Sequence, residues 1–86
     1  MKWDRRGLEQ SQELGARIRK RRTALNLSQE DLGERSGLHR TYIGHLERGE
    51  INPSLLNILK VAAALDVDAG KLLAGLSKSL GDPRIA

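Results

Sequence analysis

Apolar residues recur at helical spacing in the first third of the chain. Leu14, Ile18 and Leu25 are separated by four and seven residues, which places them on one face of a helix. Ser11 is a suitable N-cap for this helix, and the helix dipole favours Glu13 in its first turn. The pattern therefore predicts an amphipathic helix that begins at Ser11, with the basic run RIRKRR on its other faces.

A second apolar pattern follows the segment EINP. Ser54 is a suitable N-cap for the run LLNILKVAAALDV. One stripe of the predicted helix is apolar and consists of Leu55, Ile58, Ala62 and Leu65, with Val61 beside it. This is the most apolar helix that the sequence predicts.

Two short helices are predicted between these long ones. Ser28 is a suitable N-cap for a helix over residues 29–36, which has acidic residues in its first turn. Gly37 can adopt the left-handed conformation that ends a helix. The next helix covers roughly residues 39–48 and closes at Gly49.

A last short helix is predicted after Asp68, which is a suitable N-cap. We expect residues 1–10 to form a loose arm, residues 11–75 to form one domain and residues 76–86 to form a tail. No stretch has the alternating pattern of a strand. The sequence therefore predicts an all-α fold of five helices.

The core must be aliphatic, because Phe is absent and Trp3 and Tyr42 are the only aromatic residues. A chain of 86 residues buries only about 60% of its unfolded surface, so this core is small. We assign these residues to it: Leu14, Ile18, Leu32, Leu38, Ile43, Leu46, Leu55, Ile58, Ala62 and Leu65. Trp3, alone in a polar arm, is a dimer contact, a packing lid or neither.

Several classes of function are disfavoured by composition. The absence of Cys removes disulfides, thiolate nucleophiles and Cys-based zinc sites. His39 and His45 lie on different faces of a helix with no carboxylate or thiol to complete a metal site, so we expect no metal and no cofactor. A core this small leaves little room for a catalytic pocket, so we do not expect an enzyme. The chain has no secretion signal and no apolar run near the roughly 18 residues of a membrane span, which predicts a cytoplasmic protein without membrane contact.

Positive charge is concentrated in the N-terminal half. Residues 1–40 contain ten Lys and Arg against six Asp and Glu, whereas residues 41–86 contain five of each class. This asymmetry favours a polyanionic partner on one side of the molecule, the alternative being a solvated basic helix face.

Two short helices joined by a Gly-containing turn, after a basic helix, are the layout of a helix-turn-helix. The run SQEDLGERSGLHRTYIGHLERGEINPSLLNILKVAAALDV resembles the phage-repressor and Cro-like (XRE-type) helix-turn-helix family. It has SQE, the turn glycine, LE, the second glycine, PS and a final L-x-V at the family's spacings. The resemblance covers residues 11–75 and implies a compact lambda-repressor-like domain that binds double-stranded DNA.

Within that family, GLHRTYI followed by ERG is similar to the small controller proteins of restriction-modification operons. Those proteins usually carry a second Arg shortly after the glycine. This chain has Glu50, Ile51 and Pro53 in that region instead.

Residues at the start of the recognition helix, about 39–48, are the candidates for reading bases in the major groove. Arg40 can grip guanine O6 and N7 with two hydrogen bonds. Thr41 can contact a base through its hydroxyl or methyl group, and His45 lies four residues later on the same face. Gly44 between them leaves room for a close approach to DNA.

Phosphate contacts should surround this helix and set its register. The family uses a Gln at the start of the preceding helix to hold a phosphate, which the resemblance extends to Gln29. The other candidates are His39, Tyr42, Arg48 and Asn52.

The resemblance also implies an ion pair. In the family, an Arg in the first helix pairs with the Glu of the LE dipeptide, and these residues are Arg22 and Glu47 here. We expect the pair to be partly buried and to fix the recognition helix against the first helix. The other basic residues of this helix are expected to contact either phosphates or water: Arg17, Arg19, Lys20 and Arg21.

The sequence thus favours a transcriptional regulator, such as a repressor, that binds a palindromic operator as a homodimer. Dimerisation is expected through the apolar residues of the last helix, Leu72, Leu73 and Leu76. The alternative is a protein-interaction module with the same fold, either an antitoxin that also holds a toxin or a coactivator that bridges other regulators. Arg40 and Thr41 favour the DNA-binding function, because a bridging protein has no need of them.

Overall fold

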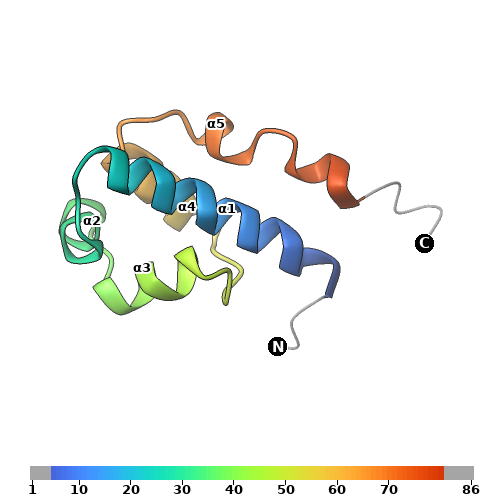
Figure 1. The fold of residues 1–86 in the computed structure, drawn as a ribbon, viewed down its shortest axis with the longest axis horizontal. Coiled ribbons are helices and arrows are strands. Elements are labelled where there is room, and N and C mark those ends of the chain that lie inside the picture. Colours follow the sequence, from blue (N-terminus) through green and yellow to red (C-terminus); the bar gives the residue numbers. More distant parts are fainter. Residues whose placement is uncertain (1–4, 81–86) are drawn as a thin grey trace.

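The computed structural model describes residues 5–80, and most of this part of the chain is helical (Figure 1). Their bounds are α1 Arg5–Ala24, α2 Gln29–Ser36, α3 Arg40–Glu47, α4 Leu55–Ala64, α5 Ala69–Leu73 and a 3₁₀ helix, η1, Leu76–Leu80. Residues 5–80 contain no strand, so the predicted all-α fold with five α-helices is confirmed.

The long helix α1 is the element around which the others are arranged. In Figure 1, α3 lies along one side of α1, and α5 and η1 lie along the other. Helix α2 packs on α3 and α4, and α4 also contacts α5. None of the helices within residues 5–80 is long and apolar enough to cross a membrane.

Three predicted N-caps are present. The Ser28 hydroxyl accepts a hydrogen bond from the Asp31 N–H at 2.9 Å, and the Asp31 carboxylate accepts one from the Ser28 N–H at 2.8 Å. This reciprocal capping box starts α2 and holds the pKa of Asp31 below its ordinary value. Ser54 and Asp68 cap α4 and α5 in the simpler way, through one backbone N–H each.

The helix ends are left-handed turns. The predicted ends of α2 and α3 are confirmed, because Gly37 has a φ of 74° and Gly49 has a φ of 71°. Asn26 and Asp66 adopt the same conformation after α1 and α4, with φ values of 58° and 53°. Polar residues with short side chains tolerate this region better than other residues that carry a Cβ.

The start of α1 differs from the sequence prediction. The helix begins at Arg5 rather than at Ser11, which is buried inside the helix instead of capping it. The extra turns lie beside η1, with which α1 is in contact. Tertiary packing therefore extends the helix into the predicted arm, and η1 occupies the first part of the predicted tail. Trp3 and the end of the tail lie outside the described residues.

The core is aliphatic and receives side chains from all five α-helices. Its buried apolar residues are Leu14, Ile18, Leu32, Ile43, Leu46, Val61, Ala62, Leu65 and Leu72. The predicted core residues Leu38 and Ile58 are partly buried against this cluster. The prediction for Leu55 is wrong, since this residue is 68% exposed in the first turn of α4. Periodicity assigns Leu55 to the inner stripe, but it does not reveal whether a neighbour covers that end of the stripe.

Candidate nucleic-acid interface

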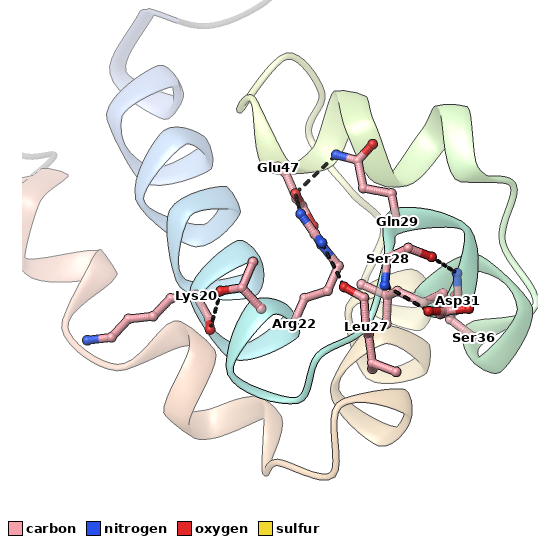
Figure 2. Close-up of polar contacts among 10 residues, drawn as sticks. Lys20, Arg22, Leu27, Ser28, Gln29, Asp31, Ser36 and Glu47 are labelled. Carbon is pink, nitrogen blue, oxygen red and sulfur yellow. Dashed lines mark hydrogen bonds and ion pairs between the residues drawn. The ribbon is translucent and has the colours of Figure 1, made fainter.

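The buried side of α3 is fixed by a charged network (Figure 2). Arg22 on α1 donates from Nε to Glu47 Oε2 at 2.6 Å and from its second terminal nitrogen to Oε1 at 2.9 Å. The Arg22 and Glu47 side chains are 11% and 3% exposed. These bonds raise the pKa of Arg22 above its ordinary value, so the guanidinium remains charged. The structure thus brings together the two residues for which the family resemblance implies an ion pair.

The same network includes the turn between α1 and α2. Arg22 also donates to the carbonyl oxygen of Leu27 at 2.8 Å, and the Gln29 side-chain amide donates to Glu47 Oε1 at 3.2 Å (Figure 2). Gln29, a predicted phosphate contact at the start of α2, is therefore half-buried and directed at Glu47. Three helices meet at one carboxylate, which fixes α2 and α3 relative to α1.

A close backbone approach accompanies this network. A Cβ atom at Gly15 of α1 would collide with the backbone carbonyl oxygens of Leu46 and Glu47 at the end of α3. At Gly49, a Cβ would come within 2.6 Å of the Gln12 Cα atom. Both glycines let the end of α3 lie directly on α1, and no local pattern in the sequence predicts this role for either.

The first turn of α3 faces outward. His39 is the N-cap rather than the first helical residue, and its Nδ1 accepts a hydrogen bond from the Thr41 N–H at 3.0 Å. Arg40 and Thr41 are exposed. One terminal nitrogen of Arg40 lies 3.6 Å from a carboxylate oxygen of Glu30 on α2, and both side chains are about two-thirds exposed. These candidate base readers are thus held only loosely.

A second polar cluster lies at the other end of α3. Glu50 Oε1 is 3.0 Å from His45 Nδ1, and it accepts a hydrogen bond from Arg48 Nε at 2.7 Å. The contacts with Arg48 and then His45 hold the pKa of Glu50 below its ordinary value. Glu50 is not among the predicted site residues. The sequence feature that could have identified Glu50 is its position directly after Gly49, because a left-handed turn at this glycine brings the chain back over the helix.

The remaining predicted phosphate contacts have different environments. Tyr42 is half-buried, and its hydroxyl accepts a hydrogen bond from the Asn57 side chain at 3.1 Å. Asn52 is exposed in the segment between α3 and α4. Arg48 is exposed, and its guanidinium lies near Gly44, where a Cβ would come within 3.1 Å of it. The absent side chain at Gly44 thus makes room for Arg48 in the free protein.

Two arginines of the basic run have structural partners. Arg17 donates to the carbonyl oxygens of Leu72 and Ala74 at 3.0 and 2.8 Å. Arg21 donates to those of Leu65 and Asp66 at 3.0 and 3.3 Å. These carbonyl groups lie at or just beyond the ends of α5 and α4. Carbonyl groups at a helix end have no N–H partner within the helix, so side chains can satisfy them. Part of the N-terminal positive charge therefore belongs to arginines that bind carbonyl groups at helix ends, in place of phosphates.

The predicted dimer surface needs one correction. Leu72 is only 4% exposed and belongs to the core, because α5 folds back on α1. Leu73 and Leu76 are half-buried against the same core. Among the described residues the large exposed apolar side chains are Leu55, Leu56, Leu59 and Leu80. No group of three or more metal-binding side chains occurs in this part of the chain.

Comparison with known sequences identifies the family. The sequence model described as helix-turn-helix matches residues 18–72, which is more than half of the chain. The chain belongs to the helix-turn-helix family. The resemblance seen in the sequence is therefore confirmed, and α2 and α3 are the two helices of the motif.

Individual relatives of this helix-turn-helix protein are regulators. The control protein C.SmaI of Serratia marcescens is 50% identical over 60 residues, which cover 70% of this chain and 71% of that protein. The restriction-modification controller protein C.AhdI of Aeromonas hydrophila is 52% identical with a TM-score of 0.70, over 71% of this chain and 92% of its own. The P22 c2 repressor, solved with a synthetic operator, is 38% identical with a TM-score of 0.69, over 74% and 97%.

These relatives are non-enzymatic DNA-binding proteins. The chain is accordingly a transcriptional regulator with a helix-turn-helix DNA-binding fold, related to controller and repressor proteins.

Proposed function

We propose that this protein binds a palindromic operator as a homodimer and regulates transcription there, with α3 in the major groove. The observation that carries the proposal is the two-sided character of α3. Its inner side is fixed by the Arg22–Glu47 pair, while Arg40 and Thr41 on its first turn are exposed. Direct readout requires such a combination, since base contacts depend on side chains held on a rigid element.

Base contacts are assigned to Arg40, Thr41 and His45. A guanidinium matches the O6 and N7 acceptors of guanine, and a Thr methyl group fits the thymine methyl. Arg40 would exchange its exposed contact with Glu30 for guanine, at little cost because that pair is solvated. Phosphate contacts are assigned to the residues around this reader: Gln29, His39, Tyr42, Arg48 and Asn52.

We infer homodimerisation from the short length of the recognition helix α3. An eight-residue α3 is about 12 Å long and reaches few base pairs, so a second copy is needed for a specific site. We assign the contact to Leu55, Leu56 and Leu59 on α4, which are 68%, 60% and 46% exposed. Their spacing puts them on one side of the helix. An apolar patch of this kind marks an interaction surface.

The operator is proposed to control a restriction-modification operon. Support comes from the relatives named as controllers, which this chain matches over most of its length. The three base-contact residues and the α4 patch supply what such a regulator needs.

The test is enrichment of random duplex DNA by the purified chain at about physiological salt, where sequence-blind attraction to phosphates is weak. We expect a palindrome with half-site centres about 10 bp apart. Arg40→Ala should lose one guanine preference, at a cost of about 1–3 kcal/mol.

Lys71→Ala is the matched control, because it removes one exposed positive charge from α5, on the far side of α1 from α3. It should leave the operator unchanged. The proposal fails if no sequence is enriched and binding merely declines with salt. Binding of a toxin or another regulator in place of an operator would instead identify a protein-interaction module.

A further inference from the structure

The two histidines at the ends of α3 have opposite partners for the same ring nitrogen. His39 Nδ1 accepts a hydrogen bond from the Thr41 N–H, so this nitrogen carries a lone pair and the proton of the neutral ring is on Nε2. His45 Nδ1 faces a carboxylate oxygen of Glu50 at 3.0 Å. An ionised carboxylate only accepts hydrogen bonds, so this contact requires the proton on His45 Nδ1.

Arg48 does not reverse this assignment. One of its terminal nitrogens lies 3.4 Å from His45 Nδ1, near the limit for a hydrogen bond. A lone pair on Nδ1 would accept that long contact, but it would also face the Glu50 carboxylate at the shorter distance. The closer contact with the charged group decides the position of the proton, because hydrogen bonds to ionised groups are the stronger ones.

The backbone and Arg48 hold Glu50 in place. The left-handed Gly49 turns the chain so that the Glu50 N–H bonds the His45 carbonyl oxygen at 3.0 Å. Arg48 Nε then binds the carboxylate at 2.7 Å, which keeps it ionised and oriented. The carboxylate is therefore fixed beside the imidazole from two directions.

We propose that Glu50 is a positioning residue that fixes the proton of His45 on Nδ1 and thereby decides which base edge His45 can read. This inference rests on the proposed function, in which α3 enters the major groove. With Nδ1 protonated, the neutral ring presents Nε2 as an acceptor. The donors on the major-groove edge are the amino groups of cytosine N4 and adenine N6. His45 accordingly selects a base pair at the position where one of these amino groups faces it.

The proton position is tested in the free protein. The full chain, with its histidines labelled with nitrogen-15, is studied by NMR at about pH 8.5, where an ordinary imidazole is neutral. We expect His39 to show the proton on Nε2 and His45 to show it on Nδ1. Glu50→Ala should move the His45 proton population toward Nε2 and leave His39 unchanged. Identical tautomers for the two rings, or no change at His45 in Glu50→Ala, would overturn the inference.

The base preference is tested by enrichment of random duplexes with the wild type, Glu50→Ala and His45→Ala. Both variants should weaken the preference for one cytosine or adenine about five- to tenfold, as expected for one hydrogen bond. In a His45→Ala background, Glu50→Ala should then have no further effect on that position. An unchanged preference in Glu50→Ala would overturn the inference even if an operator is found.

Glu30→Ala is the matched control, because it removes another exposed carboxylate next to α3. Both carboxylate variants should strengthen the sequence-blind attraction to DNA, but only Glu50→Ala should alter the preference that depends on His45. If the wild type enriches no sequence at all, the proposed function fails and this inference fails with it. If the Arg40-dependent guanine is found but no base depends on His45, only this inference fails.

Discussion

The Glu47 carboxylate accepts hydrogen bonds from side chains of two other helices. Arg22 of α1 occupies both of its oxygens, and Gln29 of α2 shares one of them. At 3% exposure the carboxylate has little access to water, so these donors replace its solvation. The arrangement orients α3, and a buried residue thus controls where the exposed side chains of Arg40 and Thr41 lie.

We expect Glu47→Ala to destabilise the protein by about 3–5 kcal/mol, because it leaves the buried Arg22 charge without its partner. For a domain of this size, this corresponds to a fall in Tm of more than about 12 °C in thermal denaturation followed by circular dichroism. Glu13→Ala removes the partner of the exposed Glu13–Arg17 pair and should change stability by less than about 1 kcal/mol. Equal melting temperatures for the two variants would contradict the structural role of the pair.

At the level of the helices, the sequence predicts the features that depend on one residue type at a fixed position relative to a helix end. The caps at Ser28, Ser54 and Asp68 and the turns at Gly37 and Gly49 are of this kind. Each depends on a side chain and a backbone group only a few residues apart, so a local pattern is enough to find it.

Features that depend on contacts between distant segments could not be predicted. The first turns of α1 depend on η1, and the burial of Leu72 depends on the packing of α5 against α1. The hydrogen bonds of Arg17 and Arg21 join α1 to residues more than forty positions away. In each case the residue type is compatible with both the exposed and the buried role, and tertiary packing selects between them.

The crossing of α1 and α3 gives a prediction at this scale. Gly15→Ala places a methyl group against the carbonyl oxygens of Leu46 and Glu47, which are backbone atoms and cannot rotate away. We expect a loss of about 1–3 kcal/mol from the resulting displacement of α3. Chemical denaturation with a fluorescent or circular dichroism readout measures it.

Gly7→Ala is the control on the same helix. Among the described residues nothing lies within 4 Å of a Cβ at Gly7, so this change should stabilise α1 by about 0.5–1 kcal/mol through its helix propensity. The two Gly→Ala changes should therefore have opposite signs. A similar gain from both would mean that α1 and α3 are not in close contact at Gly15.

For the whole molecule, the charged groups around α3 and the exposed leucines of α4 form two separate surfaces. Part of the basic run of α1 is directed inward or along helix ends. The arginines at the two ends of α3 are Arg40 and Arg48. Both of these arginines have a carboxylate nearby, from Glu30 and Glu50. Such carboxylates weaken sequence-blind attraction to phosphates, which favours specific over general binding. The apolar patch on α4 is a separate feature.

We expect Leu55→Ser to dissociate the proposed dimer while leaving the fold of each subunit intact. In a two-fold interface each residue occurs twice, and each buried Leu contributes about 1.5–3 kcal/mol, so the dimer should weaken at least about 100-fold. Because Leu55 is 68% exposed in the single chain, its loss should not lower the Tm of the monomer. Sedimentation equilibrium measures the association directly.

Leu80→Ser, which removes an exposed Leu from η1, is the control and should not change the association. If Leu80→Ser dissociates the dimer and Leu55→Ser does not, the subunits meet through η1, and the spacing of the two α3 helices must be derived from that contact instead.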